Sequence, residues 1–185
     1  MMFVDIRKFS VIAELRTPEE VVKILNDFFR AATDVIFKHK GTLDTYIGDA
    51  LMALFGAPLT NPDDADRALR AAVEMMLRLE EFNKELDEPL HIGIGLNTAS
   101  VIAGNVGTDQ RMDYTVIGDG VNIAARLEKL SKKYETKIIL SENTYNQLSE
   151  KFEAVSHGDV SIEGRKAPVK VYGIPQSSVS AFVNL

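Results

Sequence analysis

Thr42-Leu43-Asp44-Thr45-Tyr46-Ile47-Gly48-Asp49-Ala50-Leu51-Met52-Ala53-Leu54-Phe55 is the stretch that decides the fold. It contains two runs of strand-favouring residues, 42–47 and 50–55, separated by the tight pair Gly48-Asp49. Two such runs around a two-residue turn predict a β-hairpin. The rest of the architecture follows from what lies on either side of this hairpin.

A long amphipathic helix is predicted directly before the hairpin. Thr17 is its expected N-cap, in a capping box with Glu20, and Gly41 is expected to end it as the C′ residue. The apolar residues of its buried face recur at three- and four-residue spacing. These residues are Val21, Leu25, Phe28, Ala32 and Val35.

The remaining elements complete a mixed α/β pattern. The segment Met2 to Ile6 predicts a strand interrupted by one acid, and a second helix is expected from about residue 61 until before Pro89. Further expected elements are strands at 91–97, 101–103, 114–117, 138–140 and 169–174, a helix over 120–132, and a short helix capped by Ser141. The last strand is expected to close the sheet.

This order of elements predicts an α/β (α+β) fold with a ferredoxin-like βαββαβ core and additional strands and helices. Residues 1–175 are expected to form one domain, followed by a serine-rich C-terminal tail, 176–185, that we expect to be frayed. The chain enters a strand-like run almost at once, which indicates a domain cut from a longer protein.

Composition excludes several classes of protein. The chain has 185 residues, 45% of them hydrophobic and 26% charged, which are ordinary globular values. It has no cysteine, so a disulfide framework and a thiolate metal site are excluded, and a cytoplasmic location is expected. A net charge of −6 argues against a nucleic-acid polymer as partner.

We expect no membrane segment and no signal peptide. The three histidines lack zinc-ligand spacing: His39, His91 and His157.

Two aspartates are candidate metal ligands. Asp5 ends an apolar strand, where an unpaired carboxylate is costly to bury, and Asp49 lies at the tip of the hairpin. In the split βαβ arrangement the first strand and the hairpin are neighbours, so the two carboxylates can converge and suit Mg²⁺ or Mn²⁺. Each also has a purely structural explanation, Asp5 as a turn cap and Asp49 as a hairpin corner with positive φ. The turn from Ile6 to Ser10 offers backbone N–H groups to phosphates.

Asn122 and Arg126 are candidate substrate-binding residues. They are four apart on the helix expected over 120–132, so they share one helix face. An amide and a guanidinium on one face can orient a sugar and hold a phosphate. The alternative is an ordinary solvated helix face.

Taken together, the motifs resemble those of the class III nucleotidyl cyclase catalytic domains. The stretches that carry the resemblance are 3–10 and 46–56 for the metal motifs, 114–127 for the transition-state motif, and 93–97 with 104–107 for the intervening strand and loop. They span nearly the whole chain, from Phe3 to Ile174, in the family's order. The resemblance implies the fold of the class III cyclase homology domain, with residues 1–175 as its catalytic domain.

The resemblance also implies a head-to-tail homodimer with two sites at the interface. In each site Asp5, Asp49 and the carbonyl of Ile6 bind two Mg²⁺ or Mn²⁺ ions, and the partner subunit supplies the other residues. Asn122 would orient the ribose, and Arg126 would stabilise charge on the α-phosphoryl group in the transition state. The implied reaction converts ATP to 3′,5′-cyclic AMP and pyrophosphate, with any regulatory domain outside this chain.

Further substrate contacts are implied by position in the family. Phe9 and Ser10 belong to the turn that faces the triphosphate, and Lys137 and Arg165 are candidates to bind it.

The base-reading pair departs from the family pattern. Family members that use ATP usually have lysine at the position of Thr45, and guanylyl cyclases usually have glutamate there. The partner position holds Thr115, as in one bacterial subgroup of adenylyl cyclases. We therefore expect ATP as substrate. The open alternatives are relaxed or GTP specificity, and a weakly active or non-catalytic cyclase-homology domain that binds nucleotide or dimerises. A diguanylate cyclase is disfavoured, because no Gly-Gly-Asp-Glu-Phe-like hairpin is present.

Overall fold

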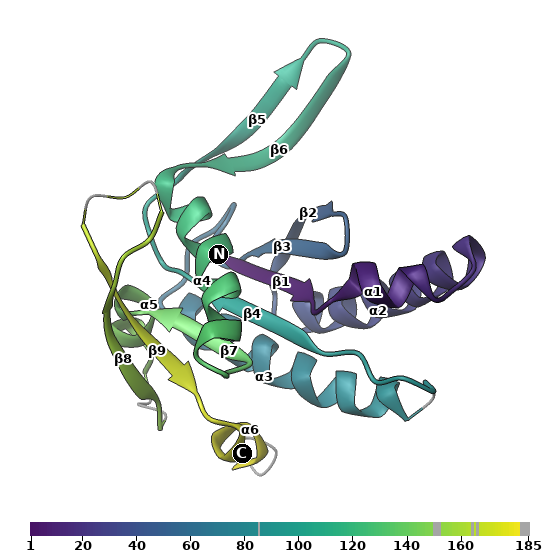
Figure 1. The fold of residues 1–185 in the computed structure, drawn as a ribbon. Coiled ribbons are helices and arrows are strands. Elements are labelled where there is room, and N and C mark those ends of the chain that lie inside the picture. The colour runs from purple at the N-terminus through teal and green to yellow at the C-terminus, as the bar shows by residue number, and fades with distance from the viewer. Residues whose placement is uncertain (85, 150–152, 164, 166, 182–185) are drawn as a thin grey trace.

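A mixed sheet with helices on both faces forms the body of the molecule, and a two-stranded arm projects from it (Figure 1). The computed structural model describes residues 1–84, 86–149, 153–163, 165 and 167–181. The strands are β1 (Met2–Ile6), β2 (Thr42–Ile47), β3 (Ala50–Leu54), β4 (Ile92–Leu96), β5 (Ile102–Thr108), β6 (Arg111–Ile117), β7 (Ile138–Ser141), β8 (Val155–Val160) and β9 (Val169–Ile174). The helices are α1 (Phe9–Glu14), α2 (Pro18–Lys38), α3 (Asp64–Asn83), α4 (Asp119–Lys133), α5 (Glu142–Gln147) and α6 (Gln176–Ala181).

The sheet confirms the ferredoxin-like core. Its strand order is β2-β3-β1-β4-β7-β9-β8, and β1 pairs antiparallel with both β3 and β4. Strand β3 therefore lies between β1 and β2, as in a split βαβ unit. The strands β5 and β6 pair only with each other, in a separate sheet that forms the arm.

Helices α2 and α3 cover one face of the sheet, and α4 lies on the other. Alternate residues of β1 and β4, including Val4 and Ile94, are fully buried in the core beneath α2 and α3. On the opposite face Ile123 and Leu127 of α4 pack in a second cluster with Ile139 of β7. Because side chains alternate across a strand, Asp5 points toward the α4 face.

The predicted start of α2 is confirmed, but its end differs from the prediction. Thr17 and Glu20 form the capping box. At the C-terminus Lys40, not Gly41, has positive φ, and the Gly41 N–H donates to the Ile36 carbonyl at 2.8 Å, as in a Schellman motif. Gly41 serves packing instead, since a Cβ atom there would come within 2.8 Å of the Phe55 ring.

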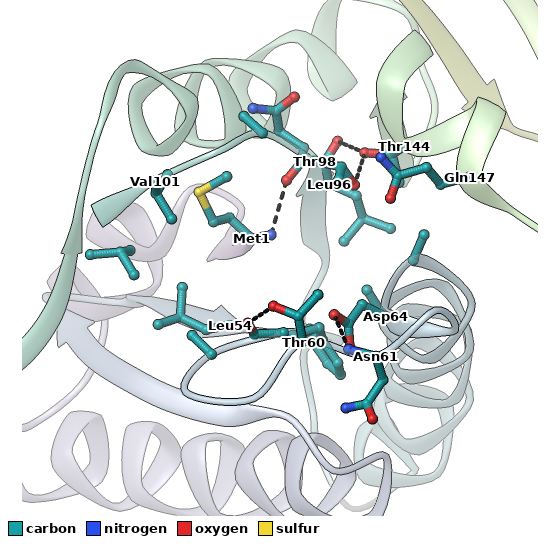
Figure 2. Close-up of a pocket in the computed structure, with 18 of the residues that line it drawn as sticks. Met1, Leu54, Thr60, Asn61, Asp64, Leu96, Thr98, Val101, Thr144 and Gln147 are labelled. Carbon is teal, nitrogen blue, oxygen red and sulfur yellow. Dashed lines mark hydrogen bonds between the residues drawn. The ribbon is translucent and has the colours of Figure 1, made fainter. Parts of the chain in front are cut away.

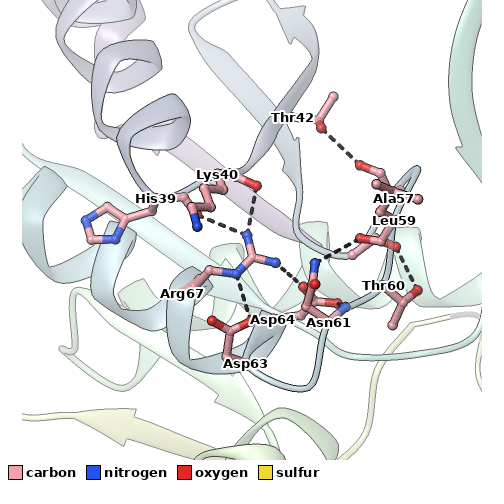
Figure 3. Close-up of polar contacts among 11 residues, drawn as sticks. His39, Lys40, Thr42, Ala57, Leu59, Thr60, Asn61, Asp63, Asp64 and Arg67 are labelled. Atoms are coloured by element: carbon pink, nitrogen blue, oxygen red, sulfur yellow. Dashed lines mark hydrogen bonds and ion pairs between the residues drawn. The ribbon is translucent and has the colours of Figure 1, made fainter.

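Arg67 joins the end of α2 to the start of α3 (Figure 3). Its Nη1 donates to the carbonyls of His39 and Lys40 at 3.0 and 2.8 Å, which satisfies carbonyls that a helix end leaves free. The same guanidinium pairs with Asp63, at 3.1 Å, and with Asp64. This buried side chain therefore holds the helix pair in register behind the sheet.

Two expectations about the periphery were wrong. The edge of the sheet is β8, not the strand 169–174, and β8, which contains His157, was not predicted. The tail is not frayed from Gln176, because Gln176–Ala181 form α6 and Val179 is buried against the main core. Residues 182–185 of the tail lie outside the described residues. Among the described residues, no helix has both the length and the apolar character needed to cross a membrane.

Candidate active site at the end of β1

Strand pairing brings the two candidate metal ligands to the same edge. Asp5 is the direct partner of Ala50 across β1 and β3, and Asp49 precedes Ala50 in the hairpin turn. Burial raises the pKa of Asp5, and the negative charge of Asp49 raises it further, whereas Arg7 and Lys129 lower it. The positive φ of the turn belongs to Gly48, so the structural explanation of Asp49 as a positive-φ corner is wrong.

The donor set fits a hard divalent cation. Two half-buried carboxylates that repel each other are stabilised when a cation lies between them. Among the described residues, no group of three or more His, Cys, Asp or Glu side chains is placed to hold a metal. Such an ion would therefore need backbone carbonyl, water or substrate oxygens to complete its coordination, which suits Mg²⁺ or Mn²⁺ better than zinc.

An ion pair between half-buried Arg7 and buried Glu128 lies beside Asp5. Arg7 Nη1 is 3.9 Å from Asp5 Oδ1 and 2.6 Å from Glu128 Oε1 of α4. Its Nη2 donates to the Glu128 carbonyl at 3.0 Å and to the Ser131 hydroxyl. Burial raises the pKa of Glu128 to about 7; the charge of Arg7 offsets part of this rise, and that of Asp5 adds to it. Sequence reasoning missed Arg7 and Glu128, although each stands within one of the quoted motifs or directly after it.

Two glycines of β4 make room for this arrangement. A Cβ atom on Gly93 would overlap the Arg7 guanidinium, and one on Gly95 would come within 2.4 Å of the Ala124 carbonyl oxygen in α4. Helix α4 therefore lies directly on the backbone of β4. The glycines of the Gly93-Ile94-Gly95 motif serve the close approach of helix to strand.

Asn122 and Arg126 lie on α4, as predicted. The helix begins after Gly118, and Asn122 is exposed while Arg126 is half-buried. Among the described residues, no hydrogen bond or ion pair links either side chain to Asp5 or Asp49. The structure therefore records no direct contact between these two groups of candidate residues in the part of the chain that it describes.

The other candidate phosphate ligands fall into two separate hollows. Lys137 lines a cavity of about 460 Å³ together with Asp5, Arg7 and Lys8. Arg165 instead lines a cavity of about 280 Å³, where it lies 3.7 Å from Asp119. The candidates Phe9 and Ser10 begin the short helix α1 directly after β1.

The two candidate base-reading threonines differ in their surroundings. Thr45 is exposed on β2, and its hydroxyl donates to the Tyr46 carbonyl at 3.3 Å. Thr115 is half-buried on β6, and its hydroxyl donates to Asp44 Oδ2 at 3.0 Å. Asp44 sits at a β-bulge, since Leu43 pairs with Ala53 while Thr45 pairs with Met52.

A cavity of about 510 Å³ lies away from these residues (Figure 2). Figure 2 shows Thr60, Asn61 and Asp64 on one side of it, facing Thr98 and Thr144 on the other. Its walls contain none of the candidate catalytic, metal or base-reading residues. The candidate chemistry is therefore at strand ends and on helix α4, not in this cavity.

Comparisons with known proteins place these features in context. The family model described as the adenylate and guanylate cyclase catalytic domain matches residues 1–176. Adenylate cyclase 1 of Rhizobium meliloti (strain 1021) is 34% identical over 178 residues, which is 94% of this chain but 27% of that relative. This chain therefore spans well under two thirds of the relative's length.

Solved structures agree with this match. The adenylyl cyclase CyaB from P. aeruginosa has a TM-score of 0.83 at 31% identity, covering 95% of this chain and 92% of that one. The guanylyl cyclase Cya2 has a TM-score of 0.86 at 37% identity, covering 95% and 91%. The similarity thus extends over almost the whole fold, and it includes cyclases named for each of the two purine nucleotides.

Proposed function

Because the chain belongs to the family of adenylate and guanylate cyclase catalytic domains, we propose that it converts ATP to 3′,5′-cyclic AMP and pyrophosphate. The observation that carries this proposal is the pairing of β1 with β3, which sets Asp5 beside the turn that holds Asp49. In the proposed reaction the ribose 3′-hydroxyl attacks the α-phosphorus, a P–O bond forms, and the bond to pyrophosphate breaks.

Asp5 and Asp49 would hold two Mg²⁺ or Mn²⁺ ions, with the Ile6 carbonyl as a further ligand. When bound, these ions would lower the pKa of the ribose 3′-hydroxyl and neutralise negative charge on the phosphates. Lys137, which lines the same hollow as Asp5, would add positive charge toward a triphosphate. Arg165, Phe9 and Ser10 remain proposed contacts with the nucleotide.

Asn122 and Arg126 would act on the nucleotide from the other side of the site. Asn122 would orient the ribose, and Arg126 would donate hydrogen bonds to the α-phosphoryl oxygens as their charge develops. Since one chain presents these residues apart from the carboxylate pair, we propose that a second copy completes each site in a homodimer.

The arm supports an interface with a second copy. The strands β5 and β6 carry exposed apolar side chains that a monomer would leave in water. They include Ile102, which is 77% exposed, and Met112, Tyr114 and Ile117. A regulatory domain outside this chain is also proposed, because the aligned part covers 27% of the Rhizobium relative.

Cyclisation of GTP is the second candidate. The similarity to the guanylyl cyclase Cya2, at 37% identity, favours it. The exposed Thr45 lacks the charge with which a lysine or glutamate at this position would select a base. A weakly active or non-catalytic domain is the third candidate, and the same departure is its support.

The test is product formation by the purified chain with Mn²⁺ and either ATP or GTP, quantified by chromatography. Asp49→Asn keeps the shape of the side chain but removes a metal-binding charge, so we expect cyclic product to fall at least about 100-fold. Asp87→Asn, which removes an exposed charge on the loop after α3, is the matched control and should retain activity.

The outcomes separate the candidates. Cyclic AMP that disappears in Asp49→Asn supports the adenylyl cyclase, and cyclic GMP as main product supports the second candidate. Intact dimers that bind nucleotide at millimolar metal without forming product would overturn both cyclase candidates. They would support the third candidate, the non-catalytic domain.

A further inference from the structure

We infer that Asp44 sets the base preference of the site by fixing the direction of the Thr115 hydroxyl, so that the site favours a 6-aminopurine over a 6-oxopurine. The inference rests on the proposed function, and it names a positioning residue that acts through Thr115. Neither the quoted motifs nor the usual base-reading positions include Asp44.

The contact spans two parts of the fold that are distant in sequence. Thr115 Oγ1 on β6 donates to Asp44 Oδ2 on β2 at 3.0 Å, across 71 residues. The β-bulge leaves Asp44 without a partner in the register between β2 and β3. The bulge thus turns Asp44 out of the regular alternation of β2, in agreement with its contact to the base of the arm.

No other donor competes for this carboxylate among the described residues. Asp44 Oδ1 is buried and has no hydrogen-bond partner. The hydrogen bond from the Thr115 hydroxyl to Oδ2 is therefore the one that stabilises the negative charge of Asp44. Burial raises the pKa of Asp44, the hydrogen bond from Thr115 lowers it, and the charge of Asp113 raises it.

The hydrogen-bonding inventory of threonine decides what the base meets. A hydroxyl has one proton and two lone pairs. Because Asp44 accepts the proton, Thr115 presents only lone pairs to any other group. It can accept from a 6-amino group, as in adenine, whereas the 6-oxo group of guanine or hypoxanthine would place lone pairs against lone pairs.

The arm leaves space for a planar base beside this hydroxyl. Gly104 of β5 is the direct partner of Thr115, so both side-chain positions lie on the same face of the arm. A Cβ atom built on Gly104 meets nothing within 4 Å. The face next to the Thr115 hydroxyl is therefore open in one chain.

Asp44→Asn tests the inference directly. The amide is nearly isosteric, but its NH₂ group donates to Thr115 Oγ1 and frees the hydroxyl proton for a 6-oxo group. The measured quantity is the ratio of kcat/KM for ATP to that for ITP, which differ only in the 6-substituent and the N1 proton. This ratio is independent of the fraction of folded protein, so a merely structural role would not move it.

We expect Asp44→Asn to lower the ATP-to-ITP ratio about 10-fold. Asp113→Asn is the matched control: it removes a nearby exposed charge that does not contact Thr115, and the ratio should stay within about 2-fold. Thr115→Val, which removes the hydroxyl, should lower the ratio as well. In that background Asp44→Asn should have no further effect.

The results separate failure of this inference from failure of the proposed function. A wild-type preference for ITP, or an unchanged ratio in Asp44→Asn with cyclic product still formed, overturns the inference alone. Absence of product from every nucleotide overturns the proposed cyclase, and the ratio of dissociation constants for ATP and ITP, from equilibrium dialysis, then decides the inference. A 10-fold rise in that ratio, the dissociation constant for ATP over that for ITP, in Asp44→Asn supports the inference, and an unchanged ratio overturns it.

Discussion

At the scale of single residues, the informative positions are buried charges. Glu128 is 4% exposed on α4 and faces Arg7, which in turn lies 3.9 Å from Asp5. A carboxylate is kept in such a place only when a partner compensates its lost hydration. The pair thus connects the strand that carries a candidate metal ligand to the helix that carries Asn122 and Arg126.

Glu128 predicts a specific pH dependence of stability. Its pKa rises from 4.5 to about 7 on folding, so the folded state binds more protons than the unfolded state between these values. The free energy of unfolding should therefore fall as pH rises from about 4.5 to 7, and this contribution should vanish in Glu128→Gln. Urea unfolding at several pH values measures it, with the exposed Glu81→Gln as control. Parallel profiles for wild type and Glu128→Gln would contradict the assignment.

At the scale of elements, the packing of α4 on β4 positions half of the proposed site. Gly95 lets the helix backbone approach the strand, and the buried Ile123 and Leu127 anchor the helix on the sheet. The orientation of Asn122 and Arg126 is therefore set by a contact between backbones. Any side chain larger than hydrogen at position 95 must displace the helix.

Gly95→Ala is expected to lower both the stability and the activity of the protein. Its Cβ atom would come within 2.4 Å of the Glu128 nitrogen and the Ala124 carbonyl oxygen, both backbone atoms that cannot rotate away. We expect a loss of about 1–3 kcal/mol in the free energy of unfolding and a fall in kcat of at least about 10-fold. Gly104→Ala, where the added Cβ atom meets nothing, is the control for stability. Wild-type kcat in a stably folded Gly95→Ala protein would refute this role of the glycine.

At the scale of the whole molecule, the proposed function has a second copy of the chain complete each site. If sites are shared, a mixture of Asp49→Asn and Arg126→Ala subunits forms heterodimers in which one site is fully native. Random pairing makes half of the dimers mixed, each with one native site of two, so roughly a quarter of wild-type activity should return. Cyclic product measured after mixing tests this.

The matched control uses two variants of the same half-site. Mixing Asp5→Asn with Asp49→Asn subunits leaves a damaged carboxylate pair in every site, so no activity should return. Recovery in this control, or its absence in the first mixture, would exclude sites shared in the proposed way.

Much of the fold could be predicted because it follows local rules. The capping box at Thr17 and the Gly48-Asp49 hairpin each depend on a few consecutive residues, and the structure agrees with both. The strand β8 and the helix α6 were missed, because their sequences carry little periodicity and become ordered by packing against β9 and the main core. The C′ residue of α2 was predicted one position too late, at Gly41, whereas Lys40 has the positive φ. The prediction erred because both adjacent residues suited the end of the helix.

The sequence alone determined the βαββαβ core and the candidate residues Asp5, Asp49, Asn122 and Arg126, since backbone periodicity and short motifs are local properties of the chain. Only the tertiary structure decided which distant groups meet: Arg7 with Glu128 across 121 residues, and Asp44 with Thr115 across 71. Both contacts depend on how helix and strand backbones approach and on a bulge that changes the alternation of side chains. Such packing arises from the whole set of contacts at once, and no short stretch of sequence encodes it.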